Sequence, residues 1–263
     1  MHYVALVLLG ILASTSFGKP LSPDEALASF RLETADLQVR LVAAEPEVVD
    51  PVALCFDRKG RLYVVESRGY PHAGKGLPKA QSGGVARLED RDGDGRFEKR
   101  TEFARDLTFP NGILPWKNGF FVTDAPDLLF LEDLDDDGVA DTREVVLTGF
   151  FTNSSSEQLR VASPTLGPDG WIYLTSGLAG GKVTSPMHPG RAPVEARKND
   201  WRFHPETRVV ESLTSAGQAG QAFDRDGRRF VCDNRHPLRW AVFGPTPGSF
   251  CSSVSRRSRF ERS

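Results

Sequence analysis

The sequence has only three cysteines and two methionines, and no hydrophobic run long enough to span a membrane as a helix. An odd number of cysteines cannot all pair within one chain, and the absence of CxxC and CxxCH excludes a zinc knuckle and a c-type haem site. Cys55 and Cys232 lie in apolar runs, which indicates small core residues; a disulfide is the alternative. No GxGxxG pattern opens a helix, so a dinucleotide-binding fingerprint is also excluded.

The chain also lacks a large excess of either positive or negative charge. Lys and Arg number 33 against 35 Asp and Glu, for a net charge of -2. A nucleic-acid groove needs a basic face, so this balance argues against nucleic acid as a partner. The arginines at 256, 257, 259 and 262 are a local exception, interpreted as part of an irregular, solvated basic tail over residues 243–263.

The first residues resemble an export signal. An apolar run at 4–13 is too short to cross a bilayer, and small residues at 16 and 18 fit a cleavage site before Lys19. We therefore expect a signal peptide at 1–18 and a periplasmic or extracellular protein without a transmembrane helix after cleavage. The alternative is an uncleaved anchor, because the segment before the apolar run carries no Lys or Arg.

An internal repeat is the strongest signal in the sequence. Four segments each contain apolar residues, a turn ending in glycine, and a strand rich in β-branched and aromatic residues. The turn glycines, which suit tight hairpins because glycine accepts positive φ, are Gly60, Gly119, Gly170 and Gly227, spaced 59, 51 and 57 residues apart. That period is typical of four-stranded propeller blades. The sequence therefore predicts an all-β protein, a β-propeller with about four blades present.

Further strands complete these units, at 85–89 and 97–103, 128–132 and 144–147, and 201–203 and 208–212. One short helix is predicted at 22–30, where Ser22 and Glu25 can form a capping box. The predicted organisation after the signal peptide is a helix and first strand at 19–48, an incomplete β-propeller at 49–242, and the basic tail.

Two of the hairpin turns are strongly acidic. They read DRDGDGRFE at 90–98 and DLDDDGVADTRE at 133–144. Both match Asp-x-Asp-x-Asp-Gly, in which carboxylates at positions 1, 3 and 5 converge on a calcium ion and the glycine permits the sharp turn. The predicted metal ligands are Asp90, Asp92, Asp94 and Glu98 in the first loop, and Asp133, Asp135, Asp137, Asp141 and Glu144 in the second.

The two loops differ at position 12, which is Thr101 in the first and Glu144 in the second. We therefore expect the first loop to bind calcium more weakly. Because strands flank both loops, they resemble calcium loops inserted in β-hairpins, as in integrin-type propellers, and not EF-hands. The alternative is a solvated turn rich in Asp and Gly that holds no metal.

Several phrases together resemble the N-terminal propeller of the exported "membrane-bound dehydrogenase domain" family. They are LSPDEALASF at 21–30, VDPVA at 49–53, GRLYVVE at 60–66, RGYP at 68–71, FPNG at 109–112 and LED at 131–133. That propeller is similar to soluble quinoprotein glucose and sorbosone dehydrogenases, which use pyrroloquinoline quinone (PQQ) and calcium. The resemblance implies a six-bladed fold of which this chain holds only a part, through truncation or a shifted reading frame.

The catalytic pattern of those dehydrogenases is incomplete here. They place a histidine base just before the third strand unit, whereas residues 154–161 contain no histidine. The weak catalytic candidates are Glu157, Arg160 and Arg235, and the weak cofactor-binding candidates are Arg68, Tyr70 and Asn234. The alternatives are an exposed loop acid for Glu157 and a packing role for Arg160.

These features favour a non-catalytic, calcium-stabilised module that binds a small molecule, glycan or protein, or that scaffolds a redox assembly. A PQQ-dependent sugar or alcohol dehydrogenase is the alternative, and a calcium-stabilised adhesion module is a third. The absent histidine, blades and haem motif favour the first, and the sequence leaves open whether the protein is an enzyme.

Overall fold

The computed structural model describes residues 19–70, 82–152 and 158–242. The chain divides into two compact units, residues 1–41 and 42–263. Outside the described residues lie the predicted signal peptide, Cys251, Glu157 and the basic tail, so these predictions stay as they were made. No helix in the described ranges is long and apolar enough to cross a membrane.

The described part of the first unit contains one helix, α1 (Pro23–Ser29). Its start follows the predicted capping box: the Glu25 amide donates to the Ser22 hydroxyl, and the Ser22 amide donates to the Glu25 carboxylate. These hydrogen bonds lower the pKa of Glu25. No strand is described within 19–48, where the sequence predicted a first strand; the Val42 carbonyl oxygen nevertheless accepts a backbone hydrogen bond from the Phe97 amide at 2.8 Å.

The second unit consists of four antiparallel sheets. The first sheet contains β1 (Pro51–Phe56), β2 (Leu62–Glu66), β3 (Gly83–Glu89) and β4 (Lys99–Leu107). The second contains β5 (Pro110–Trp116), β6 (Gly119–Asp124), β7 (Asp127–Glu132) and β8 (Thr142–Phe150), followed at its edge by β11 (Gly181–Thr184) and β12 (Val194–Ala196). The third contains β9 (Ala162–Leu166), β10 (Ile172–Thr175), β13 (Trp201–Phe203) and β14 (Val210–Ser212). The fourth contains β15 (Gly220–Phe223), β16 (Arg229–Cys232) and β17 (Arg239–Ala241).

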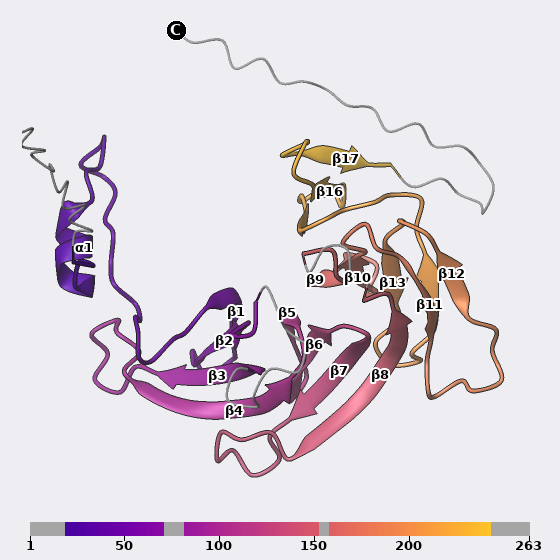
Figure 1. The fold of residues 1–263 in the computed structure, drawn as a ribbon, viewed down its shortest axis with the longest axis horizontal. Coiled ribbons are helices and arrows are strands. Elements are labelled where there is room, and N and C mark those ends of the chain that lie inside the picture. The colour runs from indigo at the N-terminus through magenta and orange to yellow at the C-terminus, as the bar shows by residue number, and fades with distance from the viewer. Residues whose placement is uncertain (1–18, 71–81, 153–157, 243–263) are drawn as a thin grey trace, which may run out of the picture. The chain divides into compact units, whose positions relative to one another are not determined.

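The sheets are arranged as propeller blades. The first strand of each sheet contacts the first strand of the next, so β1 lies against β5, β5 against β9, and β9 against β15. Within each sheet the main strands follow in chain order away from that first strand (Figure 1). This topology confirms the prediction of an all-β, propeller-like fold with four blade-like sheets.

Two hydrophobic cores lie between neighbouring sheets, and a third covers the other face of the first sheet. In β6, Phe120 and Val122 pack with Tyr63 of the first sheet, whereas Phe121 faces the opposite way and packs with the third sheet. Alternate residues of a strand point to opposite faces, and every residue of β6 is buried. A strand covered on both faces reads as a continuous apolar run, which explains the sequence GFFVT.

The repeat recurs in the hairpin turns. Asp57 and Asp224 each accept two backbone N–H bonds through Oδ1, one from two and one from four residues later. The glycines of these turns, Gly60 and Gly227, have φ of 77° and 79°. The turn of the second repeat, between β5 and β6, differs, because Lys117 has the positive φ (51°) and Gly119 does not. A Cβ at Gly119 would lie 2.4 Å from the Leu131 carbonyl oxygen, so this glycine permits a close approach of two strands.

The hairpin β11–β12 departs from simple blade order. The chain leaves the third sheet after β10, adds this hairpin to the edge of the second sheet, and returns as β13. Gly181 lies opposite Phe150, and Thr184 lies opposite Thr148. A Cβ at Gly149, which has φ of 99°, would lie 2.2 Å from the Lys182 carbonyl oxygen, so this pairing requires glycine.

Both described cysteines, Cys55 and Cys232, are free thiols and are half-buried. The sequence predicted that both are small core residues and not disulfide partners, and their free thiols agree with this. Both side chains are more exposed than a core residue would be. Burial, with a smaller effect from the Asp57 charge, raises the pKa of Cys55 to about 12.

Candidate metal centres

The first acidic loop connects β3 to β4 and is closed by its own carboxylates. Asp90 accepts from the Gly93 and Gly95 amides at 2.7 and 2.9 Å, and Asp92 accepts from the Asp94 amide at 3.1 Å. The carboxylate of Asp94 accepts from the Arg96 amide at 2.7 Å. One oxygen from each of Asp90, Asp92 and Asp94 lies within 4.8 Å of the others. Three carboxylates therefore converge where calcium-loop spacing predicts.

The second loop, between β7 and β8, repeats most of this hydrogen-bond pattern. Asp133 accepts from the Gly138 amide at 2.8 Å, as Asp90 does from Gly95. The amides of Asp137 and Val139 donate to the aspartates at positions 3 and 5, at 3.1 and 2.7 Å.

The position 9 acid completes the match. Asp141 accepts from the Leu134 amide at 2.6 Å, as Glu98 does from Arg91 at 3.3 Å. The two loops thus share one backbone fold.

Asp133 is the most buried acid of the second loop, with a side chain only 7% exposed. Its Oδ1 is buried and has no hydrogen-bond partner among the described residues, and Asp133, Asp135 and Asp141 each place an oxygen within 4.8 Å of the others. Arg87 of β3 lies beside it, 3.6 Å from Oδ2, but the Arg87 Nη1 also lacks a described hydrogen-bond partner. A buried carboxylate oxygen left in this state is well suited to a cation.

The acids at later positions do not all join the clusters. Glu144 lies in β8 opposite Phe130, and its carboxylate pairs with Arg208 at 3.3 Å. Thr101, at position 12 of the first loop, lies in β4. Since β-strands begin before position 12 in both loops, this position gives no structural reason for a weaker first loop. Asp137 and Glu98 bind loop amides, and the metal assignment stays a prediction.

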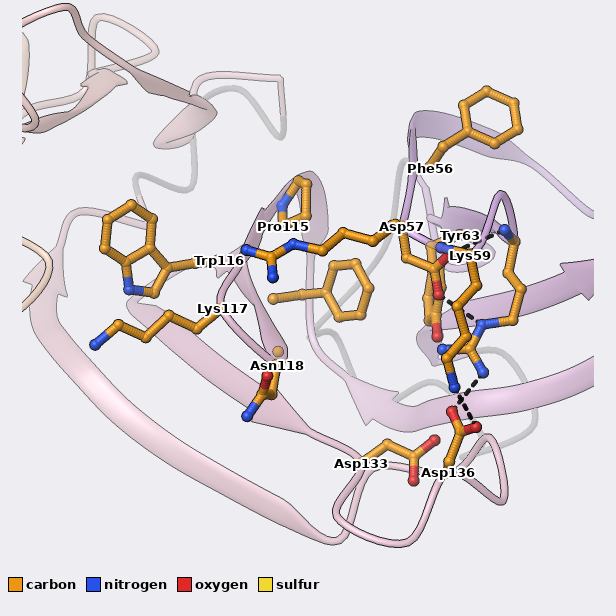
Figure 2. Close-up of a pocket in the computed structure, with 14 residues that line it drawn as sticks. Phe56, Asp57, Lys59, Tyr63, Pro115, Trp116, Lys117, Asn118, Asp133 and Asp136 are labelled. Atoms are coloured by element: carbon orange, nitrogen blue, oxygen red, sulfur yellow. Dashed lines mark hydrogen bonds and ion pairs between the residues drawn. The ribbon is translucent and has the colours of Figure 1, made fainter.

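Asp136, at position 4, faces away from the carboxylate cluster. It binds Lys59 and Arg61, at 2.5 and 2.6 Å, in the β1–β2 turn of the neighbouring sheet (Figure 2). The Lys59 and Arg61 hydrogen bonds lower the pKa of Asp136 to about 2. Arg61 also binds Asp57, so the turn and the loop form one charge network between two blades.

Sequence reasoning missed this network and the role of Arg87. An arginine inside the apolar strand VARL was a usable signal, because a buried cation requires a nearby acid. Its nearest acid is Glu89, two residues along the same strand at 2.6 Å; the longer contact with Asp133 was not identifiable, since Asp133 follows a strand of another sheet.

Gly138→Ala is expected to destabilise the protein more than Gly95→Ala, the same substitution in the first loop. Both glycines have positive φ, 97° and 92°, so each alanine costs about 1–2 kcal/mol of strain. A Cβ at Gly138 would also lie 2.2 Å from Arg87 Cζ, whereas nothing lies within 4 Å at Gly95. Displacing Arg87 adds about 1–3 kcal/mol. Urea unfolding of both variants measures the difference, and equal losses would mean that Arg87 does not support the loop.

The weak catalytic and cofactor candidates lie at the ends of the strands opposite the acidic loops. Tyr70 and Arg160 converge on Phe109: the Tyr70 ring centroid lies 6.4 Å from that of Phe109, and Arg160 Cζ lies 5.2 Å from it. Gln158 donates to the Tyr70 hydroxyl at 2.6 Å. Residues next to the first, second and third sheets therefore meet here.

The remaining candidates have other partners. Arg68 donates to Glu66 at 2.6 Å, and Arg100 binds the same buried carboxylate at 2.8 Å. Asn234 and Arg235 lie between β16 and β17, where their amides donate to Gln218 and Asp233. The structure thus brings together Tyr70 and Arg160, while Arg68 is held by a structural ion pair.

Comparison with known proteins places the chain in a family. Residues 22–255 match the model of a family described as a domain of unknown function, DUF7133. The chain belongs to the DUF7133 family. No curated protein matches it. The resemblance to the membrane-bound dehydrogenase domain stays a prediction beside this membership.

Several solved structures are similar to this DUF7133 chain. The PQQ domain of pyranose dehydrogenase from Coprinopsis cinerea is 12% identical, with a TM-score of 0.48, and the match covers 79% of this chain and 48% of that one. A luciferin-regenerating enzyme is 14% identical, with a TM-score of 0.45 and coverage of 74% and 56%. A family AA12 carbohydrate-active enzyme from Trichoderma reesei is 12% identical, with a TM-score of 0.44 and coverage of 80% and 55%. The chain spans about half the length of these proteins.

Proposed function

We propose that this DUF7133 protein is an exported, calcium-stabilised propeller module that binds or scaffolds a partner within a larger redox protein. Each acidic hairpin loop holds one calcium ion in this proposal. The observation that carries it is the buried Asp133 Oδ1 without a hydrogen-bond partner, beside two further carboxylates, in a loop whose backbone fold is repeated in the first loop.

The chemistry of the donor set supports calcium over softer metals. Every side chain in both clusters offers carboxylate oxygen, and calcium prefers six to eight oxygen ligands in flexible geometry. Three carboxylates leave room for backbone carbonyls and water. Without a cation their mutual repulsion opposes the loop fold, so calcium would stabilise the hairpins and, through Asp136, the contact between the first two sheets.

Calorimetric titration of the chelator-treated protein with calcium tests the proposal. We expect two bound ions per chain and a higher melting temperature with calcium than with EGTA, because a ligand of the folded state stabilises it. Asp90→Asn and Asp133→Asn should each remove one of the two ions. Magnesium should bind more weakly, since it requires smaller and more regular geometry.

Asp226→Asn is the matched control. Asp226 is an exposed acid in the β15–β16 turn, beside a positive-φ glycine, and it does not belong to either carboxylate cluster. This variant should retain both ions. A flat titration together with an unchanged melting temperature would refute the calcium proposal and favour solvated turns.

A PQQ-dependent dehydrogenase is the second candidate, favoured by the convergence of Tyr70 and Arg160 on Phe109. PQQ is a polycarboxylate, so its site needs several cations. Arg160 is a buried cation in this cluster, but Glu66 already binds both Arg68 and Arg100. The described residues therefore fit PQQ only in part, and we derive no catalytic step through it.

A dye-linked assay with added PQQ and calcium, over a panel of sugars and alcohols, separates the two proposals. Absence of turnover together with calcium binding supports the non-catalytic module. Turnover that is abolished by Glu157→Gln would favour the enzyme, because Glu157 is the only acid in the segment where the related dehydrogenases place their base.

A further inference from the structure

A pocket of about 460 Å³ lies between the hairpin turns of the first two sheets. Its walls come from the β1–β2 turn, from the β5–β6 turn at 117–118, and from the edge of the second acidic loop (Figure 2). The candidates around Phe109 belong to the opposite ends of the strands. A volume in this range is typical of small-molecule sites.

Aromatic side chains form part of the wall. Phe56 ends β1 with half of its surface (51%) exposed, and Trp116 ends β5 half-buried. The rings of Tyr63 and Phe120, which also line the pocket, lie 4.2 Å apart between centroids and are both buried. Half-exposed aromatic side chains on a rigid wall suit a ligand with a flat apolar face.

The charged lining is net positive, with four cations and three acids among the lining residues. Arg61 and Lys59 are bound to Asp57 and Asp136, and Lys117 pairs with Glu206 outside the pocket. Arg58, exposed in the β1–β2 turn, has no ion pair or hydrogen bond from its side chain within the described residues. It is therefore a free guanidinium, the group best suited to bidentate recognition of a carboxylate.

We propose that this pocket binds an acidic sugar unit, a uronate, which names a ligand for the binding role proposed above. Arg58 binds its carboxylate, Trp116 packs on its apolar ring face, and the Asn118 side-chain amide bonds its hydroxyls. This mixture of donors and acceptors beside aromatic side chains fits a hydroxylated ring better than an aromatic acid.

Titration with trigalacturonate, followed by tryptophan fluorescence and calorimetry, tests the inference on the full chain. The fully methyl-esterified trisaccharide is the neutral probe and should bind at least tenfold more weakly. Arg58→Gln should also weaken trigalacturonate at least tenfold, and binding should weaken as salt increases. Arg58 is an exposed turn residue, so this variant keeps the fold.

Arg225→Gln is the matched control, because Arg225 occupies the equivalent position of the β15–β16 turn, whose Asp224 makes the same bonds as Asp57. It should leave binding unchanged within twofold. Equal binding of both trisaccharides, no binding at millimolar concentration, equal weakening by the two arginine variants, or benzoate binding as tightly as trigalacturonate would each overturn the inference. The calcium titration separates the proposals: uronate binding by a protein whose calcium titration is flat would refute only the calcium proposal.

Discussion

Replacing Arg229 with methionine is expected to lower the free energy of unfolding by about 3–5 kcal/mol, because it leaves a buried carboxylate without its cation. Arg229 of β16 and Asp200, just before β13, are both fully buried, and Nη2 lies 2.8 Å from Oδ2. The same carboxylate accepts from the Ser176 and Gly217 amides at 2.9 and 2.7 Å. This cluster joins the third and fourth sheets, and urea unfolding at neutral pH measures its loss.

The loss of unfolding free energy in Arg229→Met should depend on pH. Burial raises the pKa of Asp200, and Arg229 opposes that shift. Without the arginine the folded-state pKa rises further above the unfolded value, so the folded variant gains stability when Asp200 is protonated and loses it as pH rises. The difference in unfolding free energy between wild type and Arg229→Met should therefore become smaller as pH falls toward 4.

The neighbouring Arg228 provides the control. It pairs with Asp224 at the surface and is half exposed, so Arg228→Met should leave stability close to wild type. If Arg229→Met were no more damaging than Arg228→Met, the buried ion pair would not be formed in solution.

Replacing Trp201 with alanine is expected to lower the free energy of unfolding by about 3–5 kcal/mol, through loss of a large core side chain. Trp201 is fully buried between the second and third sheets, and its ring meets Phe150 edge to face at 5.8 Å. Its indole Nε1 is buried without a described hydrogen-bond partner. Trp201→Phe should therefore cost much less, because it keeps an aromatic ring and removes an unsatisfied donor.

Thermal and urea unfolding of both variants, with Trp240→Ala as the exposed control, test this contrast. Trp240 is 44% exposed on β17, so its loss should have little effect. A Trp201→Phe variant as unstable as Trp201→Ala would show that the indole donor has a partner in solution.

Local patterns predicted the parts of the fold that depend on adjacent residues. The capping box at Ser22, the turns at Gly60, Gly170 and Gly227, and the convergence of aspartates in the two acidic hairpins each fit within about ten residues, and each formed as expected. Asp-x-Asp-x-Asp-Gly fixes its own loop because the carboxylates bond amides a few positions ahead.

Contacts between sheets could not be predicted in the same way. Glu144 has calcium-loop spacing, but the strand register places it opposite Phe130 and beside Arg208. Arg87 reaches Asp133, and Arg229 reaches Asp200, across sheets that the sequence does not align. Even Gly119, which ends a turn-like dipeptide, is needed for a close strand approach and not for its φ.

The placement of the β11–β12 hairpin on β8 has a consequence for unfolding. Propeller blades are ordinarily repeats that contact only their neighbours, so one blade can open while the others persist. Here the second sheet cannot keep its outer edge unless the chain of the third sheet is in place. We expect these two sheets to exchange their amide hydrogens as a single cooperative unit.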